Sequence, residues 1–402
     1  MLRVPVHRIT PGMILARPIP LPHDPRRFLL QRDREIPMDL VPRLKRMGVL
    51  EVWVRHRDLE FLENLIDEEL SEHQREVYAH VRRNFEQIIR NATAELDVVN
   101  FEKSILDLFN FLRRCKSGGV LLQKLDAFDN YLMSHSTNMC YLAMLVGMKV
   151  DGYLIKERKH KRAADAKDLH WLGLGCLLHD IGKMKVPRRI LDKPGKLTPE
   201  ELIEMQRHPR YGYDMVNGCV PASAAQVVLN HHQRYNGEGY PARRDMRTKQ
   251  MLPPLRGKQI PVFSRIAILA DVYDAATSKR CYSEAKPPVR VLHEMRSFCR
   301  GFFDPVIEEA FYRTVPPFPI GQVVQLSDGC EAVVVDFNAD YPTRPKVQCL
   351  RRPDGQRYDC PALEEIDLAL HDDLTVVAVD GKDITPYLAI QRTVDEPAVA
   401  GV

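Results

Sequence analysis

The stretch Cys176-Leu-Leu-His-Asp-Ile-Gly-Lys183 places a histidine and an aspartate side by side inside an apolar, helical segment. Burying a carboxylate without a partner is costly even after the protein relaxes around it. A cation or a salt bridge removes most of that cost, and Lys183 is one candidate partner for Asp180. On these residues alone, a buried aspartate–lysine pair and a metal site both remain open.

Histidines and aspartates recur in similar surroundings along the next part of the chain. His135 lies on an apolar stripe of helical spacing, where a lone histidine is more often a satisfied core residue. The others are His208 after the acidic helix Pro199–Gln206, His231 and His232 at the end of the apolar helix Ala224–Leu229, and Asp271 within the apolar run Ile266–Asp274. Their shared ligand chemistry within one helical domain indicates a common cation.

The candidate ligands then define the kind of metal site. They are His135, His179, Asp180, His208, His231, His232 and Asp271. Imidazole and carboxylate without thiolate suit Fe, Mn, Co, Ni or Zn and argue against a structural cysteine–zinc site. Seven ligands exceed the usual share of one metal, so we expect two divalent transition metals with Asp180 bridging them. Such a pair can activate a bridging hydroxide and clamp the oxygens of a phosphoryl group.

Two pairs of adjacent ligands impose a geometric condition. Neighbouring residues on a helix diverge by about 100° around its axis. His179 and Asp180, like His231 and His232, can therefore serve one cluster only if they straddle it or lie at helix ends. The chain shows no P-loop, no G-x-G-x-x-G and no G-x-S-x-G elbow that would indicate another chemistry.

Together these motifs resemble the HD-GYP family, a subgroup of the HD phosphohydrolase superfamily. The resemblance runs through about residues 125–310. It is carried by His179-Asp-Ile-Gly-Lys183, Val186–Leu191, Lys193–Thr198, His208-Pro209, His231-His-Gln-Arg-Tyr-Asn-Gly-Glu-Gly-Tyr-Pro241, and the segment Arg265–Arg280 with Asp271-Val-Tyr-Asp-Ala275. An isolated His-Asp pair is a weak signal, whereas these motifs in this order are specific.

The resemblance implies an all-helical catalytic domain that hydrolyses cyclic di-GMP to pGpG and, in some members, on to GMP. It implies the seven metal ligands named above, with iron or manganese expected first and Co, Ni or Zn as alternatives. Asp180 and Lys183 would be catalytic, and Asp274 would support a ligand from behind. The substrate-binding residues would be Lys183, Arg234, Gly239, Tyr240, Pro241 and Arg280.

This chain departs from the family pattern at several positions. Gln233 replaces the usual Glu after the histidine pair, Asn236 replaces Asp, and Ser283 replaces a basic residue. Tyr131 stands where some members carry a Glu that helps to hold a third metal, which favours a dinuclear centre. We expect these changes to affect substrate affinity and specificity more than the ability to hydrolyse a phosphodiester.

The remaining sequence predicts a mainly α protein with small domains at both ends. We expect an N-terminal α+β domain over 1–57, a connecting helix over 58–96, the HD-GYP catalytic domain over 97–315, a small β domain with SH3-like hairpins over 316–390, and a tail over 391–402. Turn residues Asp328-Gly329 and Pro353-Asp354-Gly355 predict the hairpins. The long polar helix over 58–92 suggests a homodimer.

The composition indicates which partners and which cellular location to expect for the protein. The net charge of +4 is compatible with a phosphate substrate but too weak to indicate a nucleic-acid polymer. Nine cysteines without a CxxC pair predict reduced thiols, and no apolar run is long enough to span a membrane. We therefore expect a cytoplasmic protein without membrane insertion, with protein partners in second-messenger signalling. Two alternatives stay open: a hydrolase of another cyclic dinucleotide or nucleotide, and a non-catalytic metal-binding sensor or scaffold.

Overall fold

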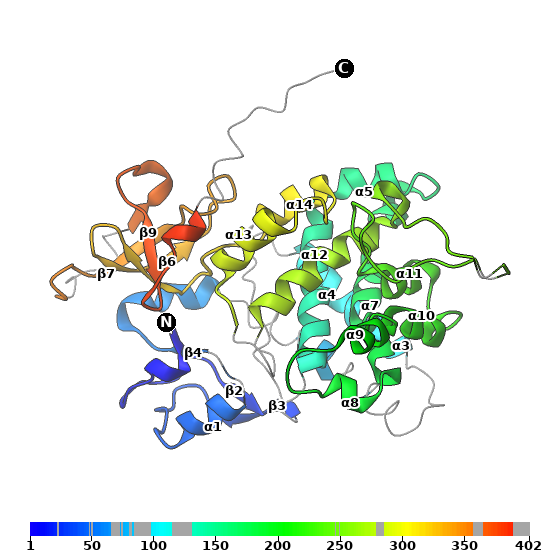
Figure 1. Ribbon diagram of the computed structural model, residues 1–402. Helices are drawn as coiled ribbons and strands as arrows, with labels where there is room; N and C mark the ends of the chain where they lie inside the picture. Colours follow the sequence, from blue (N-terminus) through cyan, green and yellow to red (C-terminus); the bar gives the residue numbers. More distant parts are fainter. Residues whose placement is uncertain are drawn as a thin grey trace.

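The fold has a helical core with β structure at both chain ends (Figure 1). The computed structural model describes residues 1–21, 24–47, 49, 51–65, 73, 75–79, 83, 98–114, 131–245, 247–248, 250–278, 285–356 and 365–388. Three candidate residues of the sequence analysis are affected: Arg280 and Ser283 lie outside these ranges, and only the backbone of Tyr131 is described.

The N-terminal region is α+β, as predicted. Strand β1 (Leu2–Pro5) pairs antiparallel with β4 (Glu51–Val54), and β2 (Ile19–Leu21) pairs with β3 (Asp24–Leu30). Helix α1 (Leu40–Arg46) precedes β4 in the chain. The prolines around β2 obscure its strand pattern in the sequence.

The predicted helix from residue 58 begins differently. The chain forms the 3-10 segment η2 (Arg57–Leu65), which is interrupted by non-helical angles at Leu59. Leu59 and Leu62 are fully buried, and they pack against residues of the C-terminal sheet within the same chain. Most of 66–97 lies outside the described residues, so the connecting helix and the homodimer stay predictions.

The central region is helical, as predicted. Its α-helices, in chain order, are α3 (Val98–Arg114), α4 (Tyr131–Lys149), α5 (Asp151–Glu157), α6 (Ala163–Ala166), α7 (His170–Leu178), α8 (Arg188–Leu191), α9 (Pro199–Met205), α10 (His208–Val216), α11 (Ala222–Asn230), α12 (Val262–Thr277), α13 (Pro288–Phe298) and α14 (Pro305–Tyr312). Short 3-10 segments precede α1, follow α7 as η3 (Ile181–Lys185) and precede α12.

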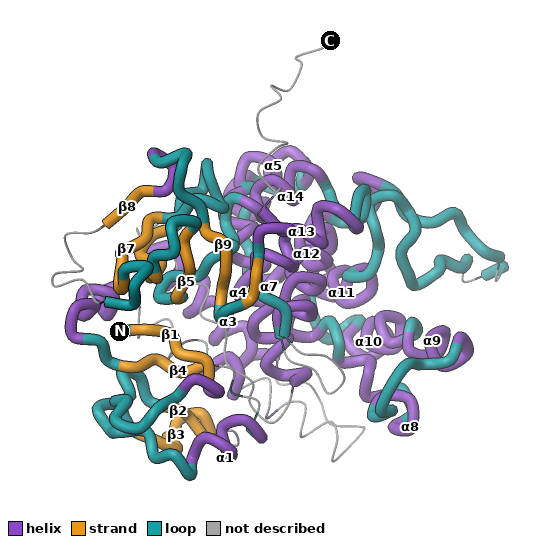
Figure 2. The backbone as a smooth tube through the Cα atoms, turned by 60° about the vertical axis from the view of Figure 1, so that its left-hand side comes forward, coloured by secondary structure: helices purple, strands orange, loops and turns teal. Residues whose placement is uncertain are grey.

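Helix α7 lies at the centre of this core. It packs against α3, α4 and α11, and α12 closes the other side of α4 (Figures 1 and 2). Its sequence, apart from its first two residues, is buried throughout because neighbouring helices cover it on all sides. This packing brings the C-terminal ends of α7 and α11, the N-terminal part of α4 and the middle of α12 to one place.

The C-terminal region is one antiparallel six-stranded sheet. Its strands are β5 (Val323–Leu326), β6 (Glu331–Asp336), β7 (Lys346–Arg351), β8 (Glu365–Asp367), β9 (Val376–Val379) and β10 (Lys382–Asp383), in the order β10-β9-β5-β6-β7-β8. The hairpin predicted at Asp328-Gly329 joins β5 to β6, with Gly329 at a positive φ of 90°. At the second predicted turn, residues 357–364 lie outside the described part of the chain.

Helix α13 connects the helical core to this sheet. Val289 packs into the core of the sheet, whereas Val291, Leu292 and Met295 pack into the helical core. The N-terminal region also contacts the sheet, because the Arg3 backbone amide donates to the Gly321 carbonyl at 3.0 Å. The three regions therefore share buried surface. None of the helices among the described residues is both long and apolar enough to cross a membrane; the cytoplasmic location stays a prediction.

Candidate metal centre

The predicted ligands come from different helices and meet inside the helical core. His135 lies on α4 and Asp271 on α12, while the remaining five lie at the ends of α7, α10 and α11. Their exposed fractions are 7% or less, except for His232, which is half-buried. Such burial of polar side chains requires partners for their polar atoms.

The adjacent pairs satisfy the condition set by the sequence. His179 is the C-cap of α7 and Asp180 leads into η3, so the helix has ended before the two side chains diverge. In the same way, His231 is the C-cap of α11 and His232 follows it. Both members of each pair can therefore face the same cluster.

Three histidines have their tautomer set by the same local interaction. The Nδ1 atoms of His179, His208 and His231 lie 2.7, 2.8 and 2.9 Å from backbone carbonyl oxygens three residues earlier. A carbonyl only accepts a hydrogen bond, so each Nδ1 carries the proton and donates it. Each Nε2 is then left with a lone pair, the form in which an imidazole binds a metal.

These lone pairs point toward one another. The Nε2 atoms of His208 and His231 are 3.2 Å apart, although neither has a proton to share with the other. The Nε2 of His179 and the Oδ1 of Asp180 are buried and make no hydrogen bond. Facing lone pairs and buried acceptors without donors repel unless a cation lies between them, so the donor set fits a metal ion.

Asp180 joins the two groups of ligand atoms. One group is His208, His231 and His232, and the other is His135, His179 and Asp180, with the atoms of each group within 4.8 Å of one another. The Oδ2 of Asp180 is 3.2 Å from His179 Nε2, and its Oδ1 is 3.2 Å from His208 Nε2. These two buried clusters are consistent with a dinuclear site, with Asp180 between the metals.

Asp271 and Asp274 enclose His135. The Nδ1 of His135 is 2.8 Å from Asp274 Oδ2, and its Nε2 is 3.1 Å from Asp271 Oδ1. The other oxygen of Asp271 is 3.4 Å from His232 Nδ1. Asp274 therefore lies behind His135, and its predicted role as a supporting residue stays a prediction, while Asp271 faces ligands of both clusters.

Electrostatics keep three of the candidate ligands in their metal-binding protonation states. Burial, with positive charge on neighbouring histidines, lowers the pKa of His231, and burial lowers the pKa of His232 to about 3. Burial alone would raise the pKa of Asp180, but His179 and Lys183 outweigh it and hold the pKa well below its usual value. The imidazoles of His231 and His232 are thus neutral, and the carboxyl of Asp180 is ionised, at neutral pH.

The pKa of His135 is shifted in the opposite direction, and this shift predicts how stability depends on pH. Burial lowers its pKa, but hydrogen bonds with Asp271 and Asp274 outweigh burial and raise it to about 9. In metal-free protein, this stabilisation is present below pH 6.5 and is lost as the pH rises through 9. We expect the free energy of unfolding to fall by on the order of 1–3 kcal/mol across that window.

Chemical denaturation of chelated protein at several pH values measures this loss. The lowered pKa of His232 acts on the acid side, where stability is lost as the pH falls from 6.5 toward 3. Asp274→Asn should flatten the alkaline loss, because it removes a charge that stabilises the His135 imidazolium. An alkaline loss that is identical in this variant would show that His135 is not its source.

Of the predicted substrate-binding residues, some contact the candidate metal ligands directly and one lies outside the described residues. Lys183 Nζ is 2.6 Å from Asp180 Oδ2, so it already neutralises a ligand. Tyr240 stacks on His232 with ring centroids 4.5 Å apart. Gly239 lies so close to the His232 carbonyl that a Cβ atom would be 2.4 Å from it. Arg280, predicted to contact a phosphate, lies outside the described residues.

Other contacts in the 233–241 loop escaped the sequence analysis. The Gln233 side-chain amide donates to the Pro241 carbonyl at 2.8 Å, a bond that the usual Glu could not make while ionised. The Arg234 guanidinium stacks on Phe302, 3.8 Å from the ring centre. The carbonyls of Cys176, Met205 and Val228 could have been anticipated from their spacing three residues before a helix-end histidine; the Arg234–Phe302 contact left no signal in the sequence.

Comparisons with known proteins agree with this geometry. A family model described as an HD domain matches residues 153–307, and one described as a KOW domain associated with an HD domain matches 323–385. A cyclic di-GMP phosphodiesterase of Pseudomonas aeruginosa, PA4108, is 34% identical over 231 residues, 56% of this chain and 50% of that protein. The cyclic di-GMP phosphodiesterase of Thermotoga maritima is 36% identical over 34% of this chain and 35% of its own.

The chain is also similar to a relative named for another substrate and to one solved structure. The 3'3'-cGAMP-specific phosphodiesterase 2 of Vibrio cholerae is 34% identical over 33% of this chain and 24% of that protein. Bd1817 of Bdellovibrio bacteriovorus, an HDG"Y"P protein, has a TM-score of 0.43 at 13% identity and covers 77% of this chain and 97% of its own. The chain spans half or less of the length of these curated relatives.

Proposed function

We propose that this chain, which belongs to the HD-GYP family of HD-domain proteins, is a metal-dependent phosphodiesterase that hydrolyses cyclic di-GMP either to pGpG or, with a second cut, to GMP. Related phosphodiesterases and the HD domain support the reaction class. The choice of cyclic di-GMP follows the names of PA4108 and the Thermotoga maritima relative.

One observation carries the proposal. The Nε2 lone pairs of His208 and His231 face each other at 3.2 Å, and the carboxylate of Asp180 lies 3.2 Å from His208 Nε2. A core that only needed satisfied histidines would pair each Nε2 with a donor. We infer that His135, His179, Asp180, His208, His231, His232 and Asp271 hold two divalent transition metals, with iron or manganese expected first.

Such metals, when bound, supply a nucleophile at neutral pH and neutralise charge on a phosphoryl group. The chain's own residues hold the ligands in place through the three backbone carbonyls and through Asp274. Lys183, which forms an ion pair with Asp180, places a positive charge at the edge of the cluster, where it can interact with a phosphodiester oxygen. The ring of Tyr240 packs against the imidazole of His232.

A turnover assay tests the proposal. Protein purified without oxygen is analysed for metal and then incubated with cyclic di-GMP, with and without a chelator, and products are separated by chromatography. We expect about two metals per chain and conversion to pGpG or GMP that the chelator stops. Binding of cyclic di-GMP without turnover, in fully metal-loaded protein, would instead support a sensor or scaffold.

Specificity for 3'3'-cGAMP is the second candidate function. Relatives named for that substrate match this chain at 30–38% identity. The same assay with both dinucleotides separates the two, because the preferred substrate has the higher kcat/KM. Protein partners in second-messenger signalling and a homodimer stay predictions.

A further inference from the structure

The segment 232–241 folds back on itself beside the candidate metal centre. The Tyr240 amide donates a hydrogen bond to the His232 carbonyl at 3.2 Å. Gly239 comes so close to the same carbonyl that a Cβ atom there would lie 2.4 Å from the oxygen. The last residues of the segment, 239–241, form its return limb, and this limb takes its position from the limb that carries His232.

The outer part of the segment is anchored separately. The Tyr235 amide donates to the Phe302 carbonyl at 2.8 Å, shortly before α14 begins. Arg256 Nε donates to the Asn236 carbonyl at 3.0 Å, from the part of the chain that leads into α12. Both bonds hold the outer part to neighbouring segments, and neither reaches the return limb.

Gln233 supplies a side-chain hydrogen bond to the return limb. It is 2% exposed, and its Nε2 donates to the Pro241 carbonyl at 2.8 Å. A carbonyl only accepts a hydrogen bond, so the amide nitrogen of Gln233, and not its oxygen, has to face Pro241. The Oε1 of Gln233 is buried and makes no hydrogen bond with the described residues.

An ionised glutamate would not fit the place of Gln233. One carboxylate oxygen would face the Pro241 carbonyl, and the other would take the position of Oε1, where no described group donates. Acceptors would then be buried without donors, at a cost that the negative charge makes larger. The glutamine, although it departs from the family pattern, is therefore matched to this turn of the chain.

The return limb carries the ring of Tyr240 to the metal centre. Its centroid is 4.5 Å from that of His232 and 6.3 Å from that of His208. The chain is held on both sides of this ring, by the His232 carbonyl at the Tyr240 amide and by Gln233 at Pro241. Loss of either bond gives the ring more conformational freedom, which binding would have to remove again.

We propose that Gln233 is a positioning residue, which holds the return limb in the conformation that receives the substrate. The inference rests on the proposed function in one respect, because it takes Gly239, Tyr240 and Pro241 as residues that contact the cyclic dinucleotide. A limb that is ordered before binding costs less free energy when the substrate binds. The hydrogen bond should therefore act on substrate affinity more than on the chemical step.

Two variants of Gln233 test this role: Gln233→Met removes the donor, and Gln233→Glu replaces it by an acceptor while the carboxyl is ionised. In steady-state assays of the metal-loaded protein, we expect KM for cyclic di-GMP to rise about fivefold in Gln233→Met. The rise in Gln233→Glu should be at least as large, although this variant restores the residue that is usual in the family. In both variants kcat should change by less than about twofold and the metal content should not change, a split that a loss of fold stability alone would not produce.

Hydrogen exchange at the Tyr240 amide gives a readout that needs no turnover. In the whole, metal-loaded chain, we expect this amide to exchange about fivefold faster in Gln233→Met, because its bond to the His232 carbonyl opens when the return limb is released. Faster exchange supports the positioning role even if the unsubstituted protein does not hydrolyse cyclic di-GMP, a result that would contradict the proposed function alone.

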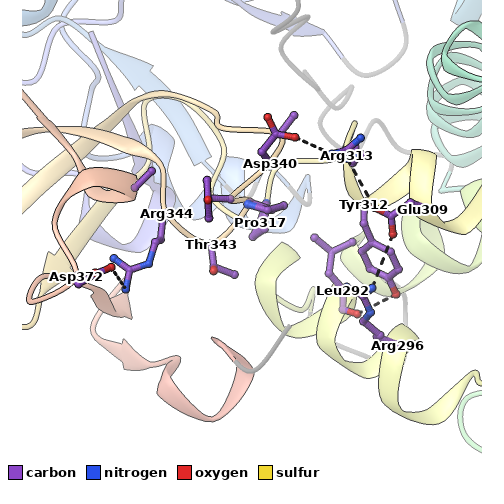
Figure 3. Close-up of a pocket in the computed structure, with 14 residues that line it drawn as sticks. Leu292, Arg296, Glu309, Tyr312, Arg313, Pro317, Asp340, Thr343, Arg344 and Asp372 are labelled. Carbon is purple, nitrogen blue, oxygen red and sulfur yellow. Dashed lines mark hydrogen bonds and ion pairs between the residues drawn. The ribbon is translucent and has the colours of Figure 1, made fainter. Parts of the chain in front are cut away.

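Arg313→Met is the matched control, because it also replaces a hydrogen-bonding side chain by methionine. Arg313 donates to Asp340 at 2.6 Å in a groove beside α14, and the residues that line this groove include neither the segment 232–241 nor a candidate metal ligand (Figure 3). Gln250→Glu, at an exposed site, is the control for charge. Both controls should keep the KM and the exchange rate of the unsubstituted protein. Unchanged KM and unchanged exchange in both Gln233→Met and Gln233→Glu would overturn the inference.

Discussion

Asp180→Ala should reduce phosphodiesterase activity by on the order of 10³-fold or more and lower the metal content from about two per chain to one or none. Asp180 is 1% exposed, and its two oxygens lie 3.2 Å from His179 and His208 in different clusters. Its removal therefore takes a ligand from both proposed metals at once, and it leaves Lys183 without its carboxylate partner.

Metal analysis and turnover, measured on the same sample, check this result. Asp180→Asn separates charge from shape, because asparagine keeps the volume and loses the negative charge. The matched control is Asp192→Ala, because Asp192 forms an exposed ion pair with Arg188 and touches no ligand; its activity should be normal. Normal metal content and rate in Asp180→Ala would contradict the assignment of this centre.

Gly182→Ala should destabilise the fold by about 3 kcal/mol and deplete the metal. A Cβ atom at Gly182 would lie 1.9 Å from the His208 carbonyl oxygen and 2.4 Å from the Gly212 amide nitrogen. Both contacts are with backbone, which cannot rotate away as a side chain can. Segment η3 must then separate from α10, and His208 moves away from Asp180 with it.

Thermal and chemical unfolding measure the loss of stability, and metal analysis measures the displacement of His208. Gly152→Ala is the matched control, because Gly152 lies in helix α5 and a Cβ atom added there would meet no atom within 4 Å. That variant should be neutral or stabilised by up to about 1 kcal/mol. If both variants melted at the same temperature, the close approach of η3 to α10 would not contribute to stability.

The candidate metal ligands were recognisable in the sequence because their chemistry conflicts with their surroundings. His179, Asp180 and Asp271 stand in apolar segments, where a polar side chain needs a partner. The positions of helix ends were also readable, since Asn230 and His231 end an apolar period. The resemblance to the HD-GYP family then supplied the order of motifs and the expected reaction.

The β structure was predicted less completely. The Asp328-Gly329 hairpin was readable because a glycine is favoured at its positive φ. Strands β8, β9 and β10 are only 3, 4 and 2 residues long, so they leave little local pattern. The helix expected from residue 58 gave way to η2, because the packing of Leu59 and Leu62 against the sheet outweighs helix propensity.

The sequence by itself determined which residues could bind a metal and that a helical domain would carry them. Only the tertiary structure decided that two pairs of neighbours sit at helix ends and that three Nδ1 atoms donate to backbone carbonyls, leaving the Nε2 lone pairs to converge. The physical reason is that residue chemistry is local, whereas the direction of a lone pair depends on how distant helices pack.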